Sequence, residues 1–128
     1  MKALIQRVSS SHVEVDGKVV GEIDKGLLVF LGLEKKDSEL DADKMISKVL
    51  SYRVFPDENQ KMNLSLKDIS GEILLVSQFT LATDKKNGRR TEFSPAMRRN
   101  EAESVYKYFV AETRAFNLET DGGIFGTE

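Results

Sequence analysis

The stretch that decides the fold is residues 72–81, which read Glu72-Ile73-Leu74-Leu75-Val76-Ser77-Gln78-Phe79-Thr80-Leu81. Four consecutive apolar residues predict a central strand of a sheet. The residues after them alternate, so that Ser77 shares one face with Phe79, and Gln78 shares the other with Thr80. Such a polar strand end is either a functional site or only the place where a strand reaches solvent, and the pattern alone leaves both open.

The sequence before this stretch predicts further strands at residues 2–8, 12–23 and 27–33. The segment 12–23 is expected to be a hairpin, because Asp16-Gly17 lies between two alternating runs and both turn positions of such a hairpin need a positive φ. The run 27–33 is apolar almost throughout and has the length of a strand deep in a sheet.

Two helices are predicted, one on each side of the central stretch. Acidic and capping residues at 37–41 precede apolar residues at helical spacing, and this helix should end around Tyr52 to Val54, ahead of Phe55-Pro56. Between it and the central strand we expect polar turns at 57–60 and 69–71 around a short alternating segment at 62–66. The second helix should begin at Ser94-Pro95 and place an apolar stripe in the core, consisting of Ala102, Val105, Tyr106, Phe109, Val110 and Thr113.

Length and composition point to one domain. A chain of 128 residues buries roughly two-thirds of its unfolded surface, which is enough for a single core. The absence of cysteine excludes disulfides and thiolate chemistry. No apolar run approaches the roughly 20 residues of a membrane span, and the start lacks the layout of a signal peptide. We therefore expect a soluble, cytoplasmic protein.

Charge is nearly balanced, so nucleic-acid binding would need a local patch. Nineteen basic and 21 acidic residues give a net charge of −2. One candidate patch, which we call the basic loop, consists of Lys85, Lys86, Arg89 and Arg90. It is either a phosphate-binding loop or a solvated loop that keeps the chain soluble, and Arg98 and Arg99 follow shortly after it.

The sequence offers few side chains for a hydrolase that uses a nucleophile with a base, or a metal ion. Ser77 or Thr80 could act as a nucleophile only beside a base, and the single histidine, His12, lies on the first hairpin with no pattern linking it to the strand end. With one histidine and no cysteine, only scattered carboxylates remain for a metal, so no metal site is expected. No glycine-rich phosphate motif opens a helix, and no cofactor is expected.

The chain resembles the D-aminoacyl-tRNA deacylases, in which Ser-Gln-Phe-Thr-Leu is a signature. The resemblance rests on residues 77–81 and extends along the whole chain. Its further parts are Met1–Val8, Asp16–Ile23, Lys61–Leu66, Gly88-Arg89-Arg90 leading to Phe93, and Gly123-Ile124-Phe125-Gly126. It implies a compact α+β domain spanning 1–128, with a mostly antiparallel, barrel-like sheet and two main helices, working as a homodimer.

The resemblance also implies a function and a mechanism. The expected reaction is hydrolysis of the ester in D-aminoacyl-tRNA, with glycyl-tRNA(Ala) as a second substrate and with neither membrane nor DNA as a partner. In the family, the 2′-hydroxyl of the terminal adenosine is implicated in activating water, and backbone N–H groups around Ser77 and Phe79 can face the developing oxyanion. Gln78 would orient the substrate, Thr80 would line the pocket, and Phe125 would contact the terminal adenine. The basic loop would bind tRNA phosphates.

One family motif is missing from the sequence. Asn-x-Gly-Pro-x-Thr, which excludes L-amino acids in the family, does not occur, and the only prolines are Pro56 and Pro95. Arg7, which supports the Gly-Pro loop in the family, is present. Either the sequence lacks a tail with the final strands, or this is a shortened member. In the second case, the expected alternative is a catalytically impaired homodimer that binds tRNA, and a structural dimerisation protein is a third possibility.

Overall fold

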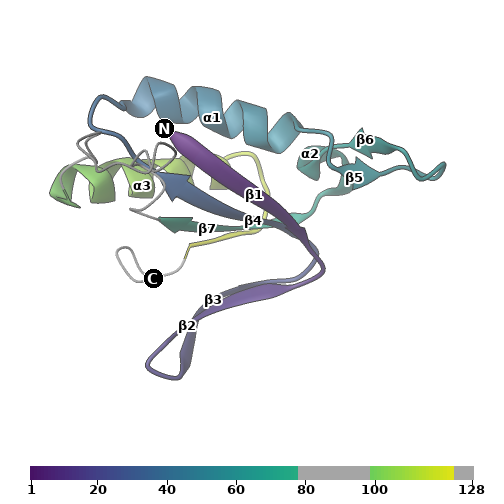
Figure 1. The fold of residues 1–128 in the computed structure, drawn as a ribbon, viewed down its shortest axis with the longest axis horizontal. Coiled ribbons are helices and arrows are strands. Elements are labelled where there is room, and N and C mark those ends of the chain that lie inside the picture. The colour runs from purple at the N-terminus through teal and green to yellow at the C-terminus, as the bar shows by residue number, and fades with distance from the viewer. Residues whose placement is uncertain (78–98, 123–128) are drawn as a thin grey trace, which may run out of the picture.

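The computed structural model describes residues 1–77 and 99–122. Their central element is a four-stranded sheet in the order β1-β4-β7-β8, with a hairpin below it and helices above it in the view of Figure 1. The sheet consists of β1 (Lys2–Val8), β4 (Gly26–Gly32), β7 (Glu72–Ser77) and β8 (Thr120–Asp121). Two separate antiparallel pairs complete the described strands: β2 (Ser11–Val15) with β3 (Lys18–Ile23), and β5 (Phe55–Pro56) with β6 (Met62–Leu64).

The sheet combines antiparallel and parallel pairing. β1 runs antiparallel to β4, whereas β7 is parallel to both β4 and β8. The β4–β7 register begins at Gly26 opposite Glu72 and ends at Leu31 opposite Ser77. Glycine is required at the first position, because a Cβ on Gly26 would lie 1.7 Å from the backbone oxygen of Glu72. The two central strands therefore meet at a closer distance than any side chain would permit.

Helices cover one face of the sheet. α1 (Glu39–Ser51) and α3 (Arg99–Arg114) pack on it, and the four-residue α2 (Leu66–Ile69) precedes β7. Alternate residues of β4 and β7 face these helices and form the core with them. The largest fully buried side chains are Phe55, Phe109, Leu27, Leu31, Ile46, Leu50, Leu66, Ile73, Leu74, Leu75, Val29 and Val49. Because side chains alternate along a strand, Leu28, Phe30 and Val76 lie on the opposite face.

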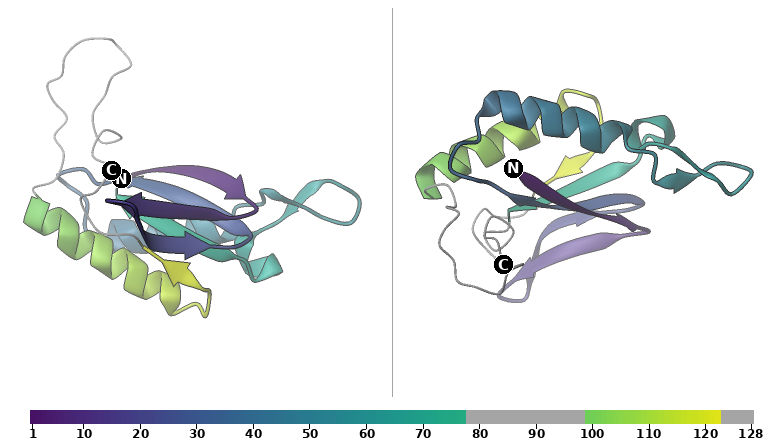
Figure 2. Two further views of the ribbon diagram at one scale, coloured as in Figure 1. Left: turned by 90° about the horizontal axis from the view of Figure 1, so that it is seen from below. Right: turned by 45° about the horizontal axis from the view of Figure 1, so that its top comes forward.

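The β2–β3 hairpin lies on that opposite face, beside β7 and β8 (Figure 2). The backbone N–H of Glu22 in β3 donates to Asp121 Oδ2 in β8 at 2.9 Å, which ties the hairpin to the edge of the sheet. Leu74 is fully buried on this face, but Phe30 is only half-buried and Leu4 is 52% exposed. The described residues thus leave the part of the face over β1 and β4 partly open.

The predicted fold class, α+β with two main helices, is confirmed. The strands at residues 2–8 and 27–33 and the hairpin also form, with φ values of 51° at Asp16 and 80° at Gly17. The described strands form no closed barrel, because the sheet they make is open at β1 and β8. The predicted start of the second helix at Ser94-Pro95 lies outside the described residues.

Three short elements are additions to the sequence-based prediction: β5, α2 and β8. α2 is too short to show a helical period, and it forms because Ser65 and Asp68 cap it reciprocally: Ser65 N donates to Asp68 Oδ2 at 2.8 Å, and Asp68 N donates to Ser65 Oγ at 3.2 Å. Ser70, with a φ of 50°, ends it. β8 has only two residues and forms through its pairing with β7. Among the helices in residues 1–77 and 99–122, none is long and apolar enough to cross a membrane.

Candidate functional site

Ser77 lies at the C-terminal end of β7, an inner strand of the sheet. Ser77 is the last described residue of this strand, pairs with Leu31 of β4, and is 6% exposed. Its side chain shares a face with Ile73 and Leu75, which is the face covered by the helices. The hydroxyl therefore points into the layer between sheet and helices. The other predicted catalytic residues, Gln78, Phe79 and Thr80, lie outside the described residues.

The backbone of β7 offers a different set of groups at the edge facing β8. Ile73 N–H donates to Glu119 O at 3.0 Å, so the polar backbone atoms of Ile73 point to this edge. In a strand, the backbone groups of every second residue point the same way, and those of Leu75 and Ser77 follow Ile73. The N–H of Ser77 thus faces the β8 side of the strand, beyond the last described pair of the β7–β8 ladder, Leu74 with Asp121.

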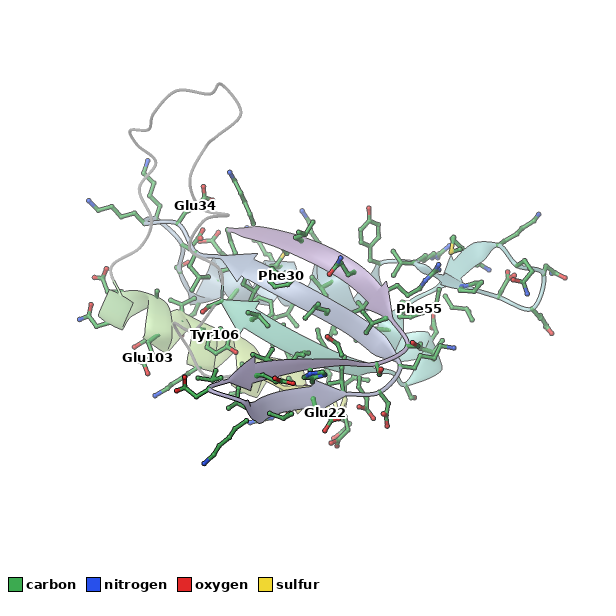
Figure 3. All side chains as sticks on the ribbon, turned by 60° about the horizontal axis from the view of Figure 1, so that its bottom comes forward. Glu22, Phe30, Glu34, Phe55, Glu103 and Tyr106 are labelled. Carbon is green, nitrogen blue, oxygen red and sulfur yellow. The ribbon has the colours of Figure 1, made fainter. Side chains whose placement is uncertain are left out.

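Tyr106 of α3 occupies the position next to this edge (Figure 3). Its hydroxyl donates to Leu75 O at 2.6 Å, and the residue is 4% exposed. Burial, assisted by the nearby negative charge of Asp121, raises the pKa of Tyr106 to about 12. The sequence placed Tyr106 in the core stripe of its helix, and the only signal for a further role was a hydroxyl within an otherwise mostly apolar stripe.

Arg7 lies at the other end of the sheet within the same chain. It pairs with Leu27, and Leu27 pairs with Ile73, so Arg7 is four strand positions away from the level of Ser77. At about 3.3 Å per residue, this corresponds to roughly 13 Å along the strands. Arg7 Nη1 donates to Val54 O at 2.8 Å and to Met62 Sδ at 3.1 Å. One chain therefore does not bring Arg7 and Ser77 together.

The remaining predicted binding residues cannot be placed. The four residues of the basic loop and Phe125 all lie outside the described ranges. Arg99, near the basic loop in sequence, is the first residue of α3. Gly122 is the last described residue before the segment that contains Phe125, and a Cβ on it would lie 2.7 Å from Tyr106 Oη.

Other polar features lie away from the end of β7. His12 Nε2 is 2.9 Å from Glu14 Oε2 on the exposed surface of the hairpin. An open pocket of about 490 Å³ lies after the C-terminal end of α3 and is lined by Arg114, Asn117, Leu118, Glu119 and Thr120. It adjoins the β8 end that pairs with Ile73, not the level of Ser77. Residues 1–77 and 99–122 contain no group of three His, Asp or Glu side chains that could hold a metal ion.

The site can therefore supply backbone donors at a strand edge more readily than a side-chain nucleophile. The Ser77 hydroxyl is on the helix-covered face, whereas His12, the single histidine of the sequence, is exposed on the hairpin that packs on the opposite face. Backbone N–H groups at fixed positions can stabilise a developing oxyanion, which is the contribution typical of acyl-transfer sites. This geometry fits hydrolysis of an ester whose own groups assist the attack of water.

Comparisons with known proteins agree on one family. The family model described as D-Tyr-tRNA(Tyr) deacylase matches residues 4–128. A D-aminoacyl-tRNA deacylase of Pseudoalteromonas translucida is 54% identical over the whole chain, which spans 88% of that relative. A protein with the same description from Thermosipho melanesiensis is 48% identical over 98% of this chain and 85% of its own.

Solved structures give the same result for the fold. The structure described as c-Myc DNA Unwinding Element Binding Protein has a TM-score of 0.90 and 36% identity, covering 100% of this chain and 87% of its own. A probable eukaryotic D-amino acid tRNA deacylase is 18% identical, with a TM-score of 0.79 over 98% of this chain and 89% of its own. This second likeness supports the fold alone.

Proposed function

This chain belongs to the D-Tyr-tRNA(Tyr) deacylase family, and we propose that it carries out the family's reaction at the end of β7. The chain is a hydrolase, and its reaction is hydrolysis of D-aminoacyl-tRNA. Cleavage of the ester releases a free D-amino acid and tRNA. Further substrates, such as glycyl-tRNA(Ala), belong to the proposal, as does a cytoplasmic location.

The observation that carries the proposed mechanism is the direction of the backbone at Ser77. Its N–H faces the strand edge beyond β8, whereas its side chain faces the helices. We assign to this N–H the stabilisation of the oxyanion that develops when water attacks the ester carbonyl, a role worth roughly 3 kcal/mol per donor. The N–H of Phe79 would supply a second donor. The 2′-hydroxyl of the terminal adenosine would activate the water.

The remaining predicted residues bind and orient the substrate in this proposal. Gln78 orients its polar groups, Thr80 lines the pocket, and Phe125 contacts the terminal adenine. The four cations of the basic loop bind tRNA phosphates, because phosphate contacts need a local concentration of positive charge in a chain with a net charge of −2. Residues 1–128 act as a single domain.

A homodimer is the second part of the proposal. The sheet face over β1 and β4 leaves Leu4 52% exposed and Phe30 half-buried, and a partner chain would cover such apolar side chains. Arg7 and Ser77 also lie about four strand positions apart in one chain. A site that uses both residues would therefore combine Arg7 of one subunit with Ser77 of the other.

The test is deacylation of D-tyrosyl-tRNA by the purified chain, with L-tyrosyl-tRNA as the matched substrate and sedimentation velocity for the oligomeric state. We expect turnover of the D-form by a dimer. Binding of tRNA without turnover would instead select the alternative, a catalytically impaired tRNA-binding homodimer. A folded monomer that still hydrolyses the ester would remove the proposed role of the second subunit.

A further inference from the structure

Packing in the core does not explain why residue 106 is a tyrosine with a hydroxyl group. A buried phenylalanine would fill the same volume in the apolar stripe of α3, yet the hydroxyl reaches across to β7 and donates to Leu75 O at 2.6 Å. It contacts the backbone of the strand and not merely a side chain, and Leu75 is two residues before Ser77. The bond therefore fixes main-chain atoms close to the proposed site.

The position of this bond along the edge of β7 is informative. β8 pairs with β7 only at Ile73 and Leu74, so Leu75 O is the first edge-facing carbonyl beyond that ladder. The hydroxyl of Tyr106 donates to this carbonyl from α3. The next backbone groups on the same edge are those of Ser77. Tyr106 thus anchors the edge between the end of β8 and the proposed oxyanion donor.

We propose that Tyr106 is a positioning residue for the deacylation reaction: its hydroxyl holds Leu75 O and thereby sets the direction of the Ser77 N–H. This inference rests on the proposed function, because it gives the N–H of Ser77 a role in the reaction. Tyr106 itself does not touch the substrate in this account. Oxyanion donors act through geometry, so a small rotation of the strand edge lowers the rate without lowering the affinity.

A second contact of Tyr106 is with the backbone at Gly122. A Cβ on Gly122 would lie 2.7 Å from Tyr106 Oη and 3.2 Å from Val110 Cγ2. The hydroxyl therefore packs against the backbone at Gly122, directly before the segment that contains Phe125. One side chain of α3 thus contacts the backbone at both Leu75 and Gly122, which are 47 positions apart in sequence.

The Tyr106 hydroxyl stays protonated near neutral pH and can therefore always donate its hydrogen bond. Burial, with the negative charge of Asp121, raises the pKa of Tyr106 to about 12. The phenol consequently stays protonated across the range in which aminoacyl esters can be studied, and it cannot serve as a general base near neutral pH. Its contribution should not change between pH 6 and pH 8 on this scale.

The first experiment compares Tyr106→Phe with Tyr108→Phe in single-turnover deacylation of D-tyrosyl-tRNA. Tyr108 is a matched control on the same helix, because its hydroxyl also donates a hydrogen bond, but to the side chain of Asp43 in α1, at 2.7 Å from Oδ1. We expect Tyr106→Phe to lower the rate constant roughly tenfold with unchanged tRNA affinity, as a displaced oxyanion donor would. Tyr108→Phe should stay within twofold of the wild-type protein. Equal rates for the two variants would overturn the inference.

The second experiment uses Gly122→Ala to displace the hydroxyl from the opposite side. In the wild-type background its methyl group pushes against Tyr106 Oη, so the rate should fall. In the Tyr106→Phe background the same methyl finds more room, and the rate should fall much less. Independent effects, equal in the two backgrounds, would contradict a shared action through the hydroxyl.

A third measurement separates this inference from the proposed function. The backbone amide resonance of Ser77 reports the strand edge without any substrate, and it should shift in Tyr106→Phe but not in Tyr108→Phe. If the wild-type protein fails to hydrolyse D-aminoacyl-tRNA while this shift is seen, the proposed function fails and the positioning contact stands. If the reaction proceeds and neither the amide nor the rate responds to Tyr106→Phe, the positioning role fails alone.

Discussion

Replacing Ser77 with alanine separates a side-chain nucleophile from a backbone donor. The Ser77 side chain is 6% exposed and shares its strand face with Ile73 and Leu75, beneath the helices. Alanine keeps the Cβ and the backbone N–H at the strand edge and removes only a buried hydroxyl. A hydrogen bond of that kind contributes about 1 kcal/mol to stability. We expect the variant to fold, with a melting temperature lowered by a few degrees.

The two mechanisms predict very different rates. If the N–H of Ser77 is the contributing group, Ser77→Ala retains turnover within roughly tenfold, which corresponds to about 1.4 kcal/mol of barrier. If the hydroxyl were the nucleophile, the loss would be several orders of magnitude; a ten-thousand-fold loss would be about 5.5 kcal/mol. The difference is too large for a change in stability or packing to obscure. Thr80→Ala carries the same expectation.

The assay is single-turnover deacylation of D-tyrosyl-tRNA, with tRNA affinity and melting temperature measured for each variant. A parallel substrate lacks the 2′-hydroxyl of the terminal adenosine and carries the amino acid on the 3′-oxygen, so only the assisting group changes. We expect this substrate to be hydrolysed far more slowly by the wild-type protein. Collapse of either alanine variant with folding and binding intact, together with normal hydrolysis of the 2′-deoxy substrate, would refute the RNA-assisted mechanism.

Three further predictions follow from the sequence and the fold. Neutralising two cations of the basic loop should weaken binding to all tRNAs alike and flatten the salt dependence of log Kd by about 0.7 to 0.9 per lost contact; an unchanged slope in filter binding would make the loop a solvated surface. Gly26→Ala should cost about 3 kcal/mol or more in urea unfolding, because its Cβ would lie 1.7 Å from Glu72 O; a loss below 1 kcal/mol would contradict the close approach. The backbone N–H of Ser65 lowers the pKa of Asp68 in the folded protein. The stabilisation from this α2 cap is therefore fully present above the unfolded pKa of Asp68, near 3.8, and is lost as the pH falls through the lower pKa of the folded state. Asp68→Asn should weaken the acid dependence of unfolding, and Ser65→Ala should cost about 1 kcal/mol at neutral pH.

Local patterns predicted most of the elements. The hairpin followed from Asp16-Gly17, since few residue pairs accept positive φ at both positions. The strand predicted at 27–33 and the helix predicted from 37–41 to around Tyr52–Val54 followed from apolar spacing, and they form as β4 and α1. Each of these depends on neighbouring residues only, which is why one sequence without relatives was enough. The tRNA deacylase function came from the Ser77–Leu81 motif and the whole-chain resemblance, and the comparisons confirmed it.

What escaped prediction depends on pairing between distant parts of the chain. The parallel pairing of β7 with β4 and β8 was not predicted. The continuous apolar run at residues 73–76 is typical of a buried parallel strand, but it indicates burial on both faces and does not identify the neighbouring strands. β8 has two residues and forms only where β7 offers an edge. The bond between Tyr106 and Leu75 joins residues 31 positions apart and involves a backbone atom, which no residue pattern can indicate.

The order of the strands determines the expected order of events during folding. The β2–β3 hairpin is the connection between β1 and β4, so residues 2–32 can fold through contacts that are local in sequence as soon as this part of the chain has been synthesised. β7 must wait for the 39 residues between β4 and β7, and its second neighbour, β8, comes another 42 residues later. The strand that ends at Ser77 is therefore expected to join a preformed sheet late. Substitutions in β1 and β4 should mainly slow folding, whereas those at the β7–β8 edge should mainly speed unfolding.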